Sequence, residues 1–105
     1  RNLKILEGTI EAIKVPFKVV ELSLSVLKNV DYILEYGNKN TVSDIGVSVL
    51  MLYAGLEGAI LNVMINLSGL TDIEMRDYYA NESINRLNQA KDIKEKIISK
   101  IYDII

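Results

Sequence analysis

Residues 42–67 of the chain read VSDIGVSVLMLYAGLEGAILNVMINL. The run is apolar on nearly every side at the helical period of 3.6 residues, so it predicts a helix buried in a bundle, in an oligomer or in a membrane. We reject the membrane because Glu57 stands near the middle, where a charge costs about 2.5–3.5 kcal/mol. Neither uncharged half reaches the roughly 20 residues that a span needs. The segment therefore predicts the central helix of a bundle.

A first long helix is predicted upstream, over residues 2–36. One stripe of this helix collects apolar residues at helical spacing, namely Ile13, Phe17, Val20, Leu24, Leu27 and Leu34. Pro16 predicts a kink or break within it, because proline lacks the N–H and crowds the preceding turn. Residues 37–40, Gly-Asn-Lys-Asn, predict its end, with the glycine in the left-handed conformation. Thr41 then predicts the capped start of the central helix.

A third long helix is predicted over residues 72–103, opened by a capping box between Thr71 and Glu74. Its inward residues are predicted to be Ile73, Tyr79, Ile84, Leu87, Ile93, Ile97 and Ile101. Its solvent face is predicted to carry Arg86, Lys91, Asp92, Lys94, Glu95, Lys96 and Lys100. No segment alternates as a strand does, so the predicted fold class is all-α, a bundle of long helices in one domain spanning residues 1–105.

Composition narrows the chemistry that the chain can perform. Of its 105 residues, 50% are hydrophobic and 25% charged, and the net charge of −2 argues against binding to nucleic acid. Cysteine and histidine are both absent, which excludes disulfides, thiolate or imidazole catalysis and zinc bound by these residues. Chemistry must therefore rest on carboxylates, amides, hydroxyls, lysine or arginine, and we expect no metal. With no signal peptide visible, we expect a cytoplasmic protein.

A narrow polar stripe runs along the central helix. At a period of 3.6 residues, one face collects Asp44, Ser48, Met51, Gly55, Gly58, Ala59, Asn62 and Asn66. Small residues at its centre would allow another helix to approach closely, with the amides forming hydrogen bonds between helices. Alternatively the stripe is the floor of a groove for a flat ligand, oriented by the polar ends. Glu57 lies on the opposite side, where we expect an ion pair to another helix or subunit.

Two blocks flanking this stripe resemble the signature of the cyclodeaminase/cyclohydrolase family. They are Gly37-Asn38-Lys39-Asn40 followed by Ser43-Asp44, and Asn62-Val63-Met64-Ile65-Asn66-Leu67. Val15-Pro16 upstream and the helix start at Asp72–Glu74 downstream fit the same pattern. The resemblance covers nearly the whole chain and corresponds to the C-terminal half of the family's domain.

The resemblance implies an all-helical, homodimeric enzyme of folate one-carbon metabolism, completed by the N-terminal half of the same domain. Its activity would be that of a formiminotetrahydrofolate cyclodeaminase, a lyase, or of a methenyltetrahydrofolate cyclohydrolase. The substrate would be a tetrahydrofolate derivative, with no covalently bound cofactor and neither nucleic acid nor membrane as a partner. The alternative function is a non-catalytic helical dimerisation module, for which the small-residue stripe would be the interface.

Site residues follow from the resemblance. Asp44 is the expected catalytic residue, either as the base that accepts a proton or as an anchor for the pterin. The residues expected to orient the substrate or brace the loop are Asn38, Asn40, Ser43, Asn62 and Asn66. Lys39 is expected to meet a glutamate carboxylate of the folate tail.

Overall fold

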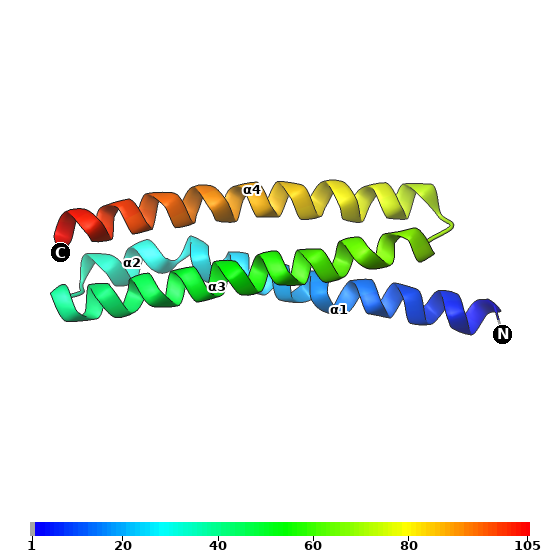
Figure 1. The fold of residues 1–105 in the computed structure, drawn as a ribbon, viewed down its shortest axis with the longest axis horizontal. Helices are drawn as coiled ribbons and strands as arrows, with labels where there is room; N and C mark the ends of the chain where they lie inside the picture. The colour runs from blue at the N-terminus through cyan, green and yellow to red at the C-terminus, as the bar shows by residue number, and fades with distance from the viewer. Residues whose placement is uncertain (1) are drawn as a thin grey trace.

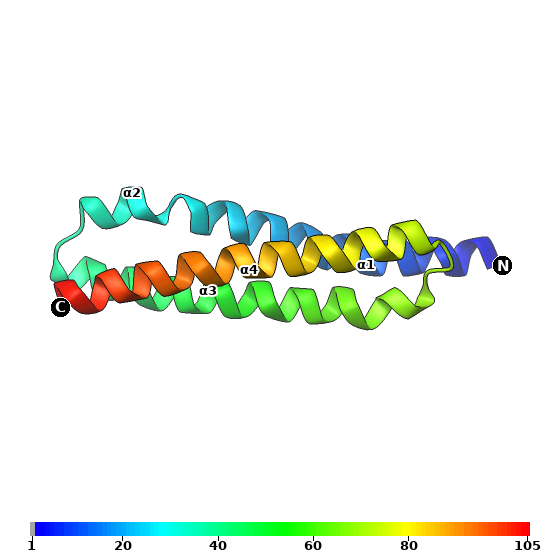
Figure 2. The same ribbon diagram turned by 90° about the horizontal axis from the view of Figure 1, so that it is seen from above.

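The computed structural model describes residues 2–105 as an elongated bundle of 57 × 19 × 18 Å (Figure 1). Its helices are α1 (Asn2–Lys28), α2 (Val30–Glu35), α3 (Lys39–Asn66) and α4 (Ile73–Ile104), with a 3₁₀ turn, η1 (Leu67–Gly69), after α3. Helix α3 runs antiparallel to both α1 and α4, and the three lie side by side along most of the bundle in both views (Figures 1 and 2). No strand occurs among the described residues, which confirms the all-α prediction.

The core forms where the apolar stripes of the three long helices meet. All six residues predicted on the stripe of the first helix are buried, from Ile13 at 0% exposed to Leu34 at 7%. Val42, Val49, Leu56 and Val63 of α3 are also buried and recur at seven-residue intervals along that helix. This regular spacing keeps one side of α3 against its neighbours for its whole length.

The predicted break in the first helix is displaced. Helix α1 continues through Pro16 and ends at Lys28, one residue before Asn29. The Asn29 side chain donates to the Ser25 carbonyl oxygen at 2.8 Å, and its backbone N–H bonds to the Val26 carbonyl oxygen at 3.0 Å. Asparagine competes in this way for backbone groups that would otherwise continue the helix. The prediction of a break near Pro16 is therefore wrong.

Both later helices begin at residues other than those predicted. Asn38 caps α3, because its side chain accepts hydrogen bonds from the Thr41 N–H at 3.0 Å and the Thr41 hydroxyl at 3.1 Å. Asp72 caps α4 by accepting from the Met75 N–H at 3.1 Å. Asparagine and aspartate are at least as good caps as threonine, so the helices start where these side chains stand. Gly37 does not adopt the predicted left-handed conformation.

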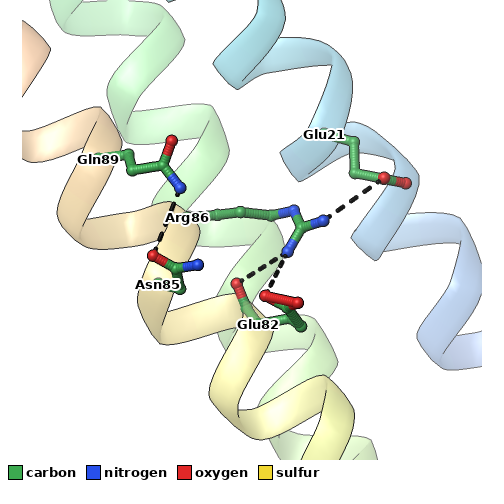
Figure 3. Close-up of polar contacts among 5 residues, drawn as sticks. All are labelled: Glu21, Glu82, Asn85, Arg86 and Gln89. Atoms are coloured by element: carbon green, nitrogen blue, oxygen red, sulfur yellow. Dashed lines mark hydrogen bonds and ion pairs between the residues drawn. The ribbon is translucent and has the colours of Figure 1, made fainter.

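Several residues of helix α4 are buried or exposed differently from the prediction. Arg86, predicted to face solvent, has a side chain only 19% exposed and reaches across to α1 (Figure 3). Ile73 and Ile84, predicted to point inward, are 61% and 47% exposed. The long stem and charged tip of arginine let it lie between two helices while its guanidinium finds carboxylates at the edge.

The segment Lys39–Gly69 is, among residues 2–105, the one helical stretch long and apolar enough to cross a membrane. Only 28% of its most apolar window is buried in the bundle. A single helix of this kind is weak evidence for a span, because the core helix of a soluble protein passes the same test. The low burial means that much apolar surface of α3 is not covered within this chain.

Candidate functional site

An open groove of about 670 Å³ lies between α1 and α3. Its α1 wall consists of Glu11, Ala12, Val15, Pro16 and Val19, and its α3 wall of Gly55, Gly58, Ala59, Asn62 and Asn66. The α3 wall is the C-terminal part of the polar stripe that the sequence singled out. The groove thus has small residues at one end and amides at the other.

Gly55 and Gly58 face open space. A β-carbon added at either position would meet no atom within 4 Å outside the helix's own nearby backbone. No other helix of the same chain therefore packs closely against these two glycines. Of the two interpretations of the polar stripe, the geometry within one chain favours the floor of a groove over a surface for close helix packing.

The polar groups of this groove come from both walls. Asn66 donates from its side-chain nitrogen to the Asn62 carbonyl oxygen at 2.8 Å, which orients its amide along α3. Glu11 supplies a carboxylate from the facing wall. Pro16 has no N–H for the Ala12 carbonyl four residues earlier, so this helix hydrogen bond is missing on the groove wall. A planar heterocycle with N–H groups would find hydrogen-bond acceptors here.

Asp44 lies in a second hollow of about 230 Å³, further along the same side of α3. Ser48 borders this hollow too, and its hydroxyl donates to the Asp44 carbonyl oxygen at 3.0 Å. The rest of the lining is mainly apolar and includes Val26 and Ile33. Asp44 therefore borders an apolar surface that could receive the face of a ring.

The structure separates the predicted site residues into two groups. Along α3, Asp44 is about 27 Å from Asn62 and about 33 Å from Asn66 at 1.5 Å per residue. Groups so far apart cannot act on the same reacting atom within one chain. The two hollows are distinct sections of one face of the molecule.

The other predicted residues lie near the start of α3. Asn38 is committed to capping the helix, and Lys39 and Asn40 are exposed in its first turn. Ser43 borders a third hollow, of about 160 Å³, between α3 and α4, together with Tyr102. Ser43 is therefore not brought to the face that carries Asp44, because consecutive helical residues point about 100° apart.

Glu11 was missed by sequence reasoning. It lies four residues before Val15 on the exposed side of α1, and an exposed glutamate in a helix is ordinary on its own. Glu11 could have been identified only from the fact that its side of α1 faces the polar stripe of α3. That fact depends on how the helices pack. Glu11 is the acidic residue in the lining of the groove that Asn62 and Asn66 also border.

Glu57 forms no ion pair within the described residues. The ion pairs found there join Arg86 to both Glu21 and Glu82, and Lys100 to Asp31. Instead it lies close to Tyr53. Burial raises the pKa of the Tyr53 phenol above its ordinary value, and the Glu57 charge adds to the shift. Residues 2–105 contain no cluster of three acidic side chains able to hold a metal ion.

Comparison with known proteins gives matches to one group. The family model described as formiminotransferase-cyclodeaminase matches residues 1–85. A methenyltetrahydrofolate cyclohydrolase of Methylorubrum extorquens is 35% identical over 101 residues, which cover 96% of this chain and 49% of that protein. Formimidoyltransferase-cyclodeaminases of Rattus norvegicus and Mus musculus are 30% and 31% identical, over 87% and 81% of this chain.

The chain spans about half the length of the cyclohydrolase, and 17% and 16% of the two longer relatives. No solved structure gave a significant match.

Proposed function

The chain belongs to the formiminotransferase-cyclodeaminase family, and on that premise we propose that it acts in folate one-carbon metabolism. The activity is that of a formiminotetrahydrofolate cyclodeaminase or a methenyltetrahydrofolate cyclohydrolase, with a tetrahydrofolate derivative as substrate. One observation carries the proposal: Asn62 and Asn66, which stand in the block that resembles the family signature, both line the groove of about 670 Å³ between α1 and α3.

Both reactions need a group that handles a proton next to a cationic carbon. In ring closure, N10 attacks the formimino carbon, loses its proton, and ammonia departs after protonation. In ring opening, water adds to the amidinium-like carbon of the methenyl bridge. A carboxylate accepts the proton in either case and stabilises the positive charge.

Asp44 is proposed for this role because it borders an apolar hollow of about 230 Å³, which could seat one face of a ring. The same carboxylate could instead accept two hydrogen bonds from the pterin, so base and anchor are both retained. Asn62 and Asn66 are proposed to orient the substrate. Lys39, exposed at the start of α3, is proposed to meet the carboxylates of the folate tail.

The remaining proposed site residues are Asn38, Asn40 and Ser43, and their proposed roles differ. Asn38 holds the start of α3 by its cap. Ser43 faces α4, so its proposed part is to brace that end of the bundle rather than to contact substrate. A homodimer, the N-terminal half of the relatives' domain and a cytoplasmic location belong to the same proposal.

The test is turnover of 5,10-methenyltetrahydrofolate, followed by loss of its near-ultraviolet absorbance, and ammonia release from 5-formiminotetrahydrofolate. Asp44→Asn is expected to lower turnover by about 10²–10⁴-fold, the usual contribution of a general base. Asp92→Asn, an exposed carboxylate on α4, is the matched control and is expected to match wild type. Full activity of Asp44→Asn would remove Asp44 from the mechanism.

The exposed apolar surface of α3 favours a second candidate, a helical dimerisation module without catalysis. The two differ in their response to folate. A ligand at 100 times its Kd stabilises a folded protein by about 2.7 kcal/mol. A chain that gains no stability from tetrahydrofolate derivatives, yet dimerises, would be such a module.

A further inference from the structure

The hollow of about 230 Å³ beside Asp44 is formed by three helices and is mostly apolar. Its apolar lining residues are Val26 of α1, Val30 and Ile33 of α2, and Ile45, Val49 and Leu52 of α3. Val30 and Val49 are 6% and 1% exposed and form its floor, whereas Val26 and Ile33 are 55% and 58% exposed at its mouth. A cavity of about 150 Å³ lined by aliphatic side chains is enough to hold a benzene ring. The hollow therefore has the size and the lining for one substituted benzene ring.

Three polar side chains border this hollow, and the hydroxyls of two of them are already engaged. The Thr41 hydroxyl donates to the Asn38 side-chain oxygen at 3.1 Å, and the Ser48 hydroxyl donates to the Asp44 carbonyl oxygen at 3.0 Å. The third is the Asp44 side chain, which forms no ion pair with any residue in the range 2–105. An ionised carboxylate only accepts hydrogen bonds. Among these side chains, a ligand in the hollow thus meets an acceptor and no free donor.

A tetrahydrofolate derivative offers two ring systems to such a hollow. The pterin carries both hydrogen-bond donors and acceptors around its edge, and its acceptors would find no free donor among these side chains. A buried polar group without a partner is unfavourable. The benzene ring of the 4-aminobenzoyl group has only carbon at its edge and leaves nothing unpaired. The lining therefore favours the benzene ring over the pterin.

Charge decides which end of that ring lies beside Asp44. The ring carries N10 at one end and, at the opposite end, a carbonyl group joined to glutamate. The glutamate carboxylates repel the Asp44 carboxylate, whereas the N10–H group can donate to it. Thr41 borders the same hollow about one turn before Asp44, so the glutamate end can extend toward the start of α3.

We propose that the hollow beside Asp44 binds the 4-aminobenzoyl ring of the folate, with N10 next to the Asp44 carboxylate and the pterin outside the hollow. This inference rests on the proposed function, and it makes Asp44 the base rather than an anchor for the pterin. In ring closure of a protonated formimino group, the carboxylate takes the proton of N10 as N10 bonds to the formimino carbon. The carboxylate then returns this proton to the amino group on that carbon. The bond between the amino group and the carbon breaks, which releases ammonia and leaves the methenyl cation.

Methyl NMR of the isotope-labelled chain locates each ring, because an aromatic ring shifts the signals of the methyl groups that it covers. We expect 4-aminobenzoylglutamate to shift the methyl signals of Ile33 and Ile45, which are assigned with Ile33→Val and Ile45→Val. A tetrahydropterin that lacks the benzoyl group is expected to leave both signals in place. Ile65, which is 75% exposed on α3 and does not border the hollow, is the control.

Two variants separate the seat of the ring from the base. Ile33→Ala alters an exposed site and should leave the chain folded, as circular dichroism can check; we expect it to weaken binding of 4-aminobenzoylglutamate about tenfold. Ile65→Ala is the matched control and is expected to bind as wild type does. Asp44→Asn is expected to retain the wild-type affinity for 5-formyltetrahydrofolate. Loss of a pterin anchor would instead lower that affinity about tenfold or more.

Shifts of the Ile33 and Ile45 signals by 4-aminobenzoylglutamate, and not by the tetrahydropterin, support the proposal. Shifts caused by the tetrahydropterin overturn it, and so does the absence of shifts with either compound. If 5-formyltetrahydrofolate then still binds elsewhere on the chain, the folate assignment stands without this inference. A chain that binds no folate at all overturns both.

Discussion

The guanidinium carbon of Arg86 on α4 lies 4.8 Å from the centroid of the Phe17 ring on α1. The same guanidinium donates to the Glu82 carboxylate at 3.0 Å and to the Glu82 carbonyl oxygen at 3.3 Å, and it approaches Glu21 of α1 at 3.7 Å (Figure 3). Phe17 in turn packs edge-on against Tyr79 at 5.1 Å. One arginine therefore joins α4 to α1 by charge and by ring contact.

Replacing Arg86 should loosen this junction. We expect Arg86→Ala to lower the free energy of unfolding by about 2 kcal/mol, since it removes a cation–π contact and charged hydrogen bonds from a half-buried site. Arg86→Lys should recover only part, because lysine lacks the planar fork. Urea unfolding followed by circular dichroism measures both. Lys91→Ala, exposed on α4, should stay within about 0.5 kcal/mol of wild type; equal losses in the two alanine variants would contradict the assignment.

Ser83 is completely buried, and its hydroxyl has no hydrogen-bond partner among the described residues. Ser83→Ala should raise the free energy of unfolding by about 1–2 kcal/mol, because it removes an unsatisfied buried group and favours the helix. Ser99→Ala, exposed on the same helix, should gain only the helix-propensity part, about 0.5 kcal/mol. Denaturant midpoints compare them, and a destabilised Ser83→Ala would show that the hydroxyl is satisfied.

Gly69 closes the turn after α3 against α1. A β-carbon there would stand 2.9 Å from the Thr9 methyl carbon, too close for both to stay in place. We expect Gly69→Ala to cost about 1–3 kcal/mol through this overpacking. Thr9→Ser removes the methyl and keeps the hydroxyl that bonds to the Ile5 carbonyl oxygen at 3.0 Å. The double variant should therefore recover most of the loss in thermal unfolding; no recovery would place the strain elsewhere.

Stability should fall at alkaline pH partly through Tyr53. Burial, with the nearby Glu57 charge, raises the Tyr53 pKa above 10.0 in the folded chain. Its contribution to stability is therefore complete below pH 10.0 and is lost as the pH rises through the folded-state value. Tyr53→Phe should lose less stability than wild type between about pH 9 and pH 11. The ring facing Lys94 is kept. Tyr36→Phe, at an 85% exposed site, should follow the wild-type curve.

Asn38 should matter for stability before it matters for chemistry. Asn38→Ala is expected to cost about 1 kcal/mol, the usual value of a lost cap, while Asn38→Ser should keep most of it. Chemical denaturation measures both, with Asn40→Ala in the same turn as the control. Activity that falls in Asn38→Ala and returns in Asn38→Ser would assign the residue to the cap rather than to the substrate.

Local patterns explain which features were predictable. The buried stripe that runs from Ile13 of α1 to Leu34 of α2 follows from helical periodicity, which depends on neighbours three and four residues away. The positions of Pro16 and Arg86 depend on what lies across from them in space. Pro16 is tolerated because its side of α1 opens onto a groove. Arg86 turns inward because it contacts Glu21 and Phe17 on α1.

The sequence alone determined that the chain is helical, that α3 carries a stripe of small and polar residues, and that its motifs belong to a folate enzyme family. It also determined the distance from Asp44 to Asn62, because both lie on one continuous helix. Only the tertiary structure decided that Gly55 faces open space and that Glu11 joins Asn62 and Asn66 in one groove. Helix formation is a local property, whereas the covering of each helix face depends on the residues that distant segments bring to it.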